Sequence, residues 1–293
     1  MKTFTLLSLV ICSVFYVNYA KDVPLIRLNS GKEVPAIGLG TWQTEGPEVI
    51  HAVRDALEAG YRHIDTAWFY HNERDVGKGM REAIDKGVVK REDVFITTKV
   101  WPRNMNRRKS FDIIKNSLKE LNTTYVDLVL VHWPLPFGRA TAEVYKGLED
   151  AYDNGMVRSL GVSNFKPQEI ETLMKTAKVK PSMNQIRVHP GFNQDKTVDY
   201  CKKNNISVTG YSPLGTGAIL QEPLLKEIGK KHNKSAAQVA IKWQLQRGLV
   251  VIPKSTTKQR IVENFNVFDF KLTDEDMKRI NSMKQNKIRD FWG

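Results

Sequence analysis

The chain has 293 residues, of which 41% are hydrophobic and 26% charged, and it contains only two cysteines. This length and composition are typical of a globular protein with a sizeable core, and they exclude disordered chains and disulfide scaffolds. Lys and Arg outnumber Asp and Glu by 45 to 32, which gives a net charge of +13. The densest basic patch spans residues 103–109, and no zinc-ligand spacing or RNA-binding aromatic motif accompanies it. We therefore interpret the charge as a basic surface that attracts a phosphorylated small molecule, and we expect no nucleic-acid partner and no bound metal.

The N-terminal segment resembles a secretory leader. Lys2 precedes an apolar run, Phe4–Val17, and the small residue Ala20 offers a cleavage point directly after it. We predict a signal peptide over residues 1–20, followed by one mature domain over residues 21–293. The mature protein is then expected to be secreted, with no stable membrane association after cleavage.

Two observations keep other locations open. Asn18 is a poor residue close to a cleavage point, so an uncleaved anchor and a cytoplasmic protein are the alternatives to export. A chain of this length contains N-glycosylation motifs by chance, so those present give export only weak support. They lie at Asn122, Asn205 and Asn233.

The mature chain opens with a predicted hairpin and continues as alternating strands and helices. Leu25–Leu28 and Glu33–Pro35 predict the hairpin, with its turn at Gly31. The predicted strands that follow are Ile37–Gly40, His63–Asp65, Phe95–Val100, Val126–His132, Ser159–Ser163, Ser182–Val188, Ser207–Tyr211 and Val250–Pro253. The main predicted helices are Pro47–Glu58, Glu73–Lys86, Ser110–Leu121, Thr141–Asn154, Pro167–Ala177, Lys196–Asn204, Ser235–Arg247 and Thr257–Asn266. About eight strand–helix units in roughly 250 residues predict an α/β protein, a single-domain (β/α)8 TIM barrel with an N-terminal β-hairpin.

The rival architecture is a doubly wound parallel sheet. That fold binds dinucleotides through Gly-x-Gly-x-x-Gly directly after its first strand, with an acidic residue further along the chain. Gly38-Leu-Gly40 is followed by Thr-Trp-Gln, so this motif is incomplete. The sequence therefore favours the barrel.

Four polar residues follow or end neighbouring predicted strands: Asp65, Tyr70, Lys99 and His132. Strands that alternate with helices place their active sites at the strands' C-terminal ends, so these side chains are expected on one face. Taken singly, each has a structural interpretation: a helix cap, a core aromatic, a surface charge and a satisfied core histidine. Lys99 follows Phe-Ile-Thr-Thr and His132 follows Leu-Val-Leu-Val. A polar side chain at the end of a buried strand is difficult to explain by a structural role alone. Together the four predict a site that protonates a carbonyl oxygen while the carbon is attacked.

The motifs around these residues resemble those of the aldo-keto reductase family. The matching segments are, in order, Gly38–Trp42, Gly60–Ala67, Tyr70–Glu73, Val126–Pro134, Gly161–Phe165 and Ile252–Ser255. The resemblance runs from about Leu25 to about Lys284. The short stretches after Trp133 and Tyr211 favour compact members, similar to glyoxal, diketogluconate and prostaglandin F reductases. In such proteins the hairpin closes the N-terminal end of the barrel.

The resemblance implies NADPH-dependent reduction of aldehydes and ketones to alcohols by hydride transfer, with Tyr70 as the proton donor. A phenol with a pKa near 10 is a weak acid at neutral pH, and the Lys99 ammonium is expected to lower that pKa. Asp65 can pair with Lys99 and keep it protonated. His132 can hydrogen-bond the substrate oxygen and orient the carbonyl. None of these groups carries a hydride, so a nicotinamide cofactor is required.

The expected cofactor residues spread over both halves of the chain. The resemblance assigns the nicotinamide carboxamide to Ser163, Asn164 and Gln185, and Tyr211 can stack on the ring. Phosphate contacts are expected at the start of the last predicted helix, where free N–H groups suit an anion, and Lys254 and Arg260 supply paired cations for a 2′-phosphate. The remaining expected cofactor residues are Thr41, Ser212, Leu214, Ser255, Thr256, Glu263 and Asn264.

Aromatic residues just past the strand ends predict the substrate pocket. They are Trp42, Phe69, Trp101 and Trp133, together with His132. An aromatic pocket admits apolar or extended carbonyl compounds, so we expect a small-molecule carbonyl substrate. Separately, we expect the protein to be a monomer. Two other functions stay open: a catalytically idle cofactor- or ligand-binding protein on the same barrel, and a secreted ligand carrier, since NADPH is scarce outside cells.

Overall fold

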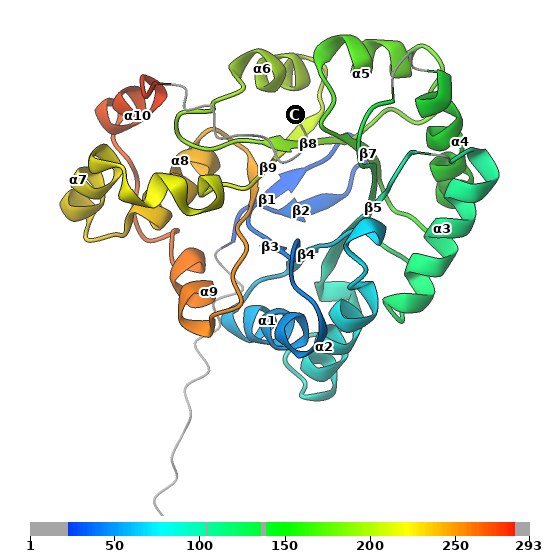
Figure 1. Ribbon diagram of the computed structural model, residues 1–293, viewed down its shortest axis with the longest axis horizontal. Coiled ribbons are helices and arrows are strands. Elements are labelled where there is room, and N and C mark those ends of the chain that lie inside the picture. Colours follow the sequence, from blue (N-terminus) through cyan, green and yellow to red (C-terminus); the bar gives the residue numbers. More distant parts are fainter. Residues whose placement is uncertain (1–22, 104, 136–138, 285–293) are drawn as a thin grey trace, which may run out of the picture.

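The computed structural model describes residues 23–103, 105–135 and 139–284, and the predicted signal peptide lies outside this range. Ten strands form a two-stranded sheet and an eight-stranded parallel sheet of order β10-β9-β8-β7-β6-β5-β4-β3. The two edges of the larger sheet meet, because the backbone N–H groups of Gly38 and Gly40 donate to the carbonyls of Val251 and Pro253 at 2.9 and 3.0 Å. Figure 1 looks into the resulting ring, with the helices outside it. The predicted (β/α)8 barrel is confirmed.

The barrel strands follow the predicted apolar runs and are mostly a little shorter. Their bounds are β3 Leu39–Gly40, β4 His63–Asp65, β5 Phe95–Val100, β6 Leu128–Val131, β7 Leu160–Ser163, β8 Met183–Arg187, β9 Ser207–Tyr211 and β10 Val250–Ile252. Strands β4, β5 and β6 are buried along their whole length, as expected for a parallel sheet covered on both faces.

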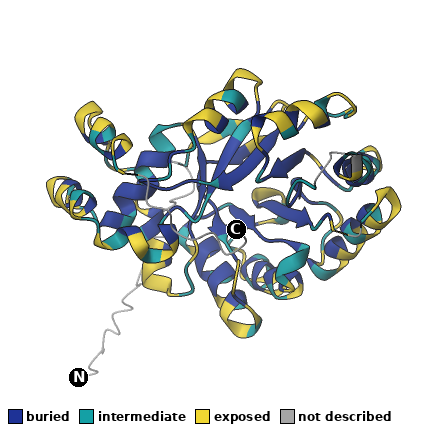
Figure 2. Ribbon diagram, turned by 45° about the horizontal axis from the view of Figure 1, so that its top comes forward, coloured by how far each residue is buried: buried dark blue, intermediate teal, exposed yellow. Residues whose placement is uncertain are grey.

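Helices cover the outside of the barrel, with their exposed faces turned outward (Figure 2). They are α1 Gly46–Ala59, α2 Glu73–Asp85, α3 Arg107–Glu120, α4 Arg139–Asp153, α5 Pro167–Met174, α6 Asp195–Lys203, α7 Pro223–His232, α8 Ala236–Gln246, α9 Lys258–Phe265 and α10 Asp274–Asn281. Helix α3 begins three residues before the prediction, because the Asn106 side chain caps it by accepting from the Lys109 N–H. Helices α7 and α10 were not predicted, although Pro223 at the start of α7 and the capping box Thr273–Asp276 before α10 are sequence signals for both.

The N-terminal hairpin closes one end of the barrel. Its strands β1 (Leu25–Arg27) and β2 (Glu33–Pro35) pair antiparallel, and Gly31 turns between them with a φ of +80°. Leu28 and Val34 of the hairpin join one buried cluster with inward-facing strand residues. The strand members of this cluster are Phe95, Leu128, Leu130, Met183 and Val250. The hairpin is therefore the floor of the barrel, as expected, and the opposite end is left for the site.

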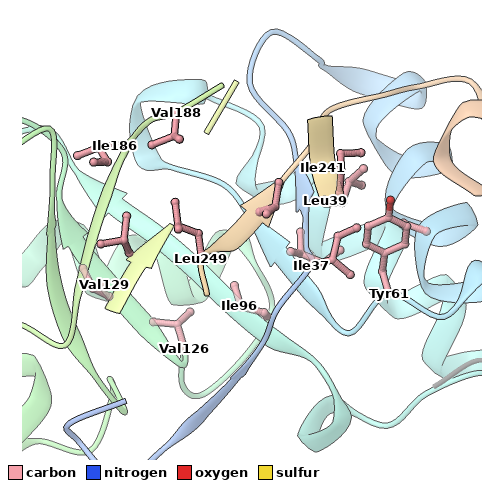
Figure 3. Close-up of a cluster of buried hydrophobic side chains, with 14 of the residues drawn as sticks. Ile37, Leu39, Tyr61, Ile96, Val126, Val129, Ile186, Val188, Ile241 and Leu249 are labelled. Carbon is pink, nitrogen blue, oxygen red and sulfur yellow. The ribbon is translucent and has the colours of Figure 1, made fainter. Parts of the chain in front are cut away.

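A second, larger core fills the space between strands and helices (Figure 3). Ile96 and Val129 contribute to it, and each is next in sequence to an inward-facing residue of the first cluster. This alternation is the period of two that a strand imposes. The labelled side chains of Figure 3 also include Tyr61 and Ile241, from the helical layer and its connections. Both faces of each strand are thus fixed by packing, which leaves the strand ends in defined positions.

Candidate active site

The four residues predicted to carry the chemistry lie together at the C-terminal end of the barrel. Asp65 ends β4, Lys99 is the fifth residue of β5, and His132 directly follows β6. Tyr70 ends a 3-10 turn, Trp68–Tyr70, that follows β4. The rings of Tyr70 and His132 lie 5.6 Å apart, centroid to centroid.

Lys99 is the centre of this group. Its Nζ donates to Asp65 Oδ1 at 2.6 Å, to the Thr66 carbonyl at 2.9 Å and to the Tyr70 hydroxyl at 3.2 Å. The Lys99 side chain is fully buried. Asp65 Oδ2 accepts a second hydrogen bond, from Gln185 Nε2 at 2.7 Å. The ammonium thus has three partners in fixed directions, one of which is the phenol.

Burial and charge act against each other in the Asp65–Lys99 pair. Burial lowers the pKa of Lys99 and raises that of Asp65, and in each case the partner's opposite charge offsets part of the shift. Removing either partner would leave a buried, uncompensated charge, which is strongly destabilising. The 2.6 Å contact between the two groups therefore holds the Lys99 amine in a fixed position beside the phenol.

The phenol and the imidazole both hold the protonation state that a reduction needs. Burial raises the pKa of Tyr70 well above its usual value, and the Asp65 carboxylate adds to the rise. This corrects the expectation of a lowered pKa, because burial and the Asp65 carboxylate both raise it. Burial and the Lys99 charge hold the pKa of His132 well below its usual value. At neutral pH the phenol therefore carries its proton, while the imidazole is neutral.

Behind the site lies a buried carboxyl that sequence reasoning missed. Glu73, the first residue of α2, accepts a hydrogen bond from Thr98 Oγ1 at 2.6 Å. Burial raises the pKa of Glu73 to about 7, although hydrogen bonds from Thr98 and Ser117 favour the ionised form. The folded protein therefore binds a proton here that the unfolded chain releases near pH 4.5.

We expect this proton to make stability depend on pH. A raised folded-state pKa contributes stability that is present below pH 4.5 and is lost as pH rises through about 7. Glu73→Gln keeps the acceptor for Thr98 and cannot ionise. The free energy of unfolding of this variant minus that of the parent should therefore increase by up to about 3 kcal/mol as the pH is raised from 5 to 8. Urea unfolding across that range measures this, and a difference that does not change with pH would contradict it.

A cavity of about 730 Å³ opens above these residues and runs from the barrel centre toward α9. Apart from Lys99, which is buried beneath it, every residue predicted for catalysis, cofactor or substrate lines this cavity. The predicted lining residues are Thr41, Trp42, Asp65, Phe69, Tyr70, Trp101, His132, Trp133, Ser163, Asn164, Gln185, Tyr211, Ser212, Leu214, Lys254, Ser255, Thr256, Arg260, Glu263 and Asn264. The structure thus joins strand ends from both halves of the chain in one elongated site.

At the inner end, amide and hydroxyl groups are fixed by their own hydrogen bonds. Asn164 Nδ2 donates to the His132 carbonyl at 3.0 Å, and its Oδ1 accepts from the Tyr211 hydroxyl at 2.9 Å. Ser163 Oγ donates to the Gln185 carbonyl at 2.9 Å. These groups present donors and acceptors beside a tyrosine ring, which suits a planar ring that carries an amide.

At the outer end, the cavity reaches the start of α9. The first turn of α9 holds no acidic residue, and the exposed Lys254 and Arg260 line the cavity next to it. Lys254 Nζ approaches the Gln43 carbonyl at 3.4 Å, across the mouth of the cavity. Paired cations beside free helical N–H groups suit a phosphate.

An aromatic wall lines the cavity near Tyr70. Phe69 stacks on Trp101 at 4.4 Å between ring centroids, and Trp42 lies 4.7 Å from the Tyr70 ring. Trp101 in turn contacts His132 at 5.2 Å. The Nδ1 of His132 is buried and has no hydrogen-bond partner among the described residues. An apolar wall with one polar corner of phenol and imidazole suits a carbonyl compound with an apolar body.

Sequence reasoning missed several other lining residues. They are Gly40, Gln43, Arg187, Pro213, Thr216, Gly217, Leu220, Ser235, Ala236, Ala237, Ile252 and Thr257. Ser235 was predicted only as the first residue of a helix, and no local signal says that the start of α8 faces the cavity. Within the described ranges, we find no cluster of metal-ligating side chains and no helix long and apolar enough to cross a membrane.

Comparisons with known proteins identify the family of the chain. The aldo/keto reductase family model matches residues 36–285. The chain is 46% identical to the 9,11-endoperoxide prostaglandin H2 reductase of Trypanosoma cruzi, over 89% of this chain and 92% of that protein. It is 41% identical to the glyoxal reductase of Bacillus subtilis, over 89% and 93%.

Solved structures of aldo-keto reductases also resemble this chain. The aldose reductase of Schistosoma japonicum superposes with a TM-score of 0.86 at 38% identity, over 92% of this chain and 94% of that one. The Bombyx mori aldo-keto reductase in complex with NADP also gives 0.86 at 38% identity, over 92% and 96%. The fold, the strand-end residues and these similarities agree, and the chain belongs to the aldo/keto reductase family of oxidoreductases.

Proposed function

We propose that this protein reduces aldehydes and ketones to alcohols with NADPH, and that Tyr70 donates the proton. The observation that carries the proposal is the Tyr70 hydroxyl, which receives a hydrogen bond from Lys99 and faces the cavity beside His132. The bound nicotinamide cofactor supplies the hydride. The chain's own part is to hold the carbonyl, protonate its oxygen and keep water out.

The proton step follows from the protonation states. Tyr70 is protonated at neutral pH because burial raises its pKa, so it can give its proton to the developing alkoxide. The Lys99 ammonium, 3.2 Å from the hydroxyl, stabilises the phenolate that forms. Neutral His132 contributes a polar group beside the carbonyl without adding a second charge.

The cavity supports a dinucleotide with a 2′-phosphate as the cofactor. Its inner end offers the amide-binding groups around Asn164, and its outer end offers Lys254 and Arg260. A phosphate on the adenine ribose would meet both cations, whereas a free ribose hydroxyl would use neither. We infer from this a preference for NADPH over NADH.

For the substrate we infer a permissive pocket. The aromatic wall of Trp42, Phe69 and Trp101 supplies apolar area with few polar groups to reject alternatives. Two of the relatives are named for activities on a prostaglandin endoperoxide and on glyoxal, and these compounds differ widely in size. Both substrate classes belong in a first screen.

The test is a turnover screen. Purified mature protein is mixed with NADPH and, in turn, with simple aldehydes, dicarbonyls such as glyoxal, quinones, ketosteroids and a prostaglandin endoperoxide, and the loss of NADPH absorbance is followed. We expect turnover with several classes. Tight NADPH binding without turnover of any carbonyl would identify an idle binding protein, and binding of neither would favour a ligand carrier.

We also propose that residues 1–20 are removed and that the mature chain is exported. The grounds are the Lys2 charge, the apolar run Phe4–Val17 and the small Ala20. The glycosylation motifs at Asn122, Asn205 and Asn233 give weak support, and all three residues are exposed. A lumenal or extracellular reductase would draw on NADPH held locally or released from cells.

Expression of the full chain in a secretory host tests export. We expect protein in the medium whose N-terminal sequence begins at Lys21, with activity retained. A variant with Leu6→Arg and Leu7→Arg, which interrupts the apolar run, serves as the control and should stay inside the cells. Parent protein confined to the cytosol with Phe4–Val17 attached would refute export and return the enzyme to cytoplasmic metabolism.

A further inference from the structure

Two buried side chains close the short loop that carries Tyr70. Thr66 precedes this loop and Asn72 follows it, and Thr66 Oγ1 donates to Asn72 Oδ1 at 2.8 Å. Neither residue is exposed to solvent. Within the loop, the Tyr70 N–H donates to the Ala67 carbonyl at 2.9 Å, which forms the 3-10 turn. The hydrogen bond between Thr66 and Asn72, here called the clasp, therefore fixes both ends of the turn that presents the phenol.

The clasp is tied to the other parts of the site. The Thr66 carbonyl accepts from Lys99 Nζ at 2.9 Å, so one end of the clasp also anchors the ammonium. Asn72 Nδ2 donates to the carbonyls of Thr41 and Thr44 at 2.9 and 2.8 Å. The loop of Thr41 and Thr44 carries Trp42, whose ring packs against Tyr70.

Asn72 thus uses both of its amide hydrogens and its oxygen to join the two ends of the Tyr70 loop to the distant loop of Thr41 and Thr44. Nothing local to Asn72 requires this, because its side chain does not cap α2, the helix that it precedes. A buried amide with all these bonds made is well suited to fixing relative positions, since each bond would be costly to lose.

We propose that Asn72 is a positioning residue for the reduction, and that through the clasp with Thr66 it sets the distance between the Tyr70 hydroxyl and Lys99. This inference rests on the proposed role of Tyr70. It adds that proton transfer depends on a bond that neither substrate nor cofactor touches. A displacement of about 1 Å at a reacting group can cost about a hundredfold in rate.

The main test is Thr66→Val, which removes the donor hydroxyl and keeps both the side-chain shape and the carbonyl that binds Lys99. We expect kcat to fall about tenfold. KM for the carbonyl and the affinity for NADPH should change by less than about twofold. The loss should fall on kcat alone, with the pH profile unchanged around neutrality, because the raised pKa of Tyr70 keeps the phenol protonated there.

The matched control is Thr209→Val. Thr209 is equally buried, and its hydroxyl contacts the Met183 sulfur at 3.0 Å rather than the clasp. This control should lose stability like Thr66→Val but keep the kcat of the parent. If both valine variants keep the parent's kcat, or lose kcat equally, the positioning role is overturned.

A double-mutant cycle checks the bond itself. Asn72→Ala should lower kcat more than Thr66→Val, because it also frees the loop of Thr41 and Thr44. Combined with Asn72→Ala, Thr66→Val should add almost nothing, since the partner of the hydroxyl is already gone. If the losses of kcat in the two single variants add in the double variant, the proposed role of the clasp is overturned. If Thr66→Val changes kcat as expected while Tyr70→Phe leaves turnover intact, the clasp acts on another group and the proposed role of Tyr70 is what fails.

Discussion

Tyr70→Phe is expected to lower carbonyl reduction by about a thousandfold, the loss associated with removing a general acid. The change deletes one oxygen, the one that lies 3.2 Å from Lys99 Nζ. The ring keeps its packing against Trp42 and His132, so the shape of the pocket is preserved. Steady-state turnover of a good aldehyde substrate measures the loss.

NADPH binding should survive this change, because the residues expected to hold the cofactor lie elsewhere in the cavity. Quenching of protein fluorescence on titration with NADPH measures it. Tyr145→Phe is the matched control: this buried hydroxyl donates to the Val179 carbonyl, far from the site, and its removal should leave turnover unchanged. Turnover of Tyr70→Phe like that of the parent would show that another group supplies the proton.

The barrel was predictable because its signals are local and repeated. Strands β6 and β10 are apolar throughout, and β4, β5 and β9 have the predicted bounds. Lys99 and His132, which we propose take part in the chemistry, could be singled out because a charge or an imidazole at the end of an apolar run is unusual. Helices α7 and α10 were missed although their capping signals are present, because both lie outside the repeating pattern of one helix after each strand.

The parts of the site that depend on tertiary contacts could not be predicted. The raised pKa of Tyr70 follows from the depth of its burial, which the sequence does not state. Asn72 and Glu73 look like ordinary residues at the start of α2, the one before the helix and the other its first residue, until the fold places Thr66 and Thr98 against them. The cavity-facing role of Ser235 likewise depends on how α8 packs beside β10 and the start of α9.

We expect the preference for NADPH over NADH to depend on Lys254 and Arg260, and we expect their removal to change it strongly. The double variant Lys254→Met, Arg260→Leu should lose about a hundredfold or more in NADPH affinity, because each charge-assisted contact to a phosphate contributes about 1.5–3 kcal/mol. NADH affinity should change little, since NADH has no 2′-phosphate. The ratio of the two dissociation constants, measured by fluorescence titration, is therefore the informative quantity.

Lys258→Met is the matched control for this variant. Lys258 belongs to the same helix, but its ammonium contacts Glu58 and Asp55 and it does not line the cavity. A general effect of basic charge would lower NADPH affinity in the control as well, and raising the salt concentration would weaken binding alike in all variants. A specific phosphate site would leave the control's preference for NADPH intact. If the double variant still discriminates as strongly as the parent, the 2′-phosphate is bound by other residues, and the cations at the start of α9 serve only the basic surface.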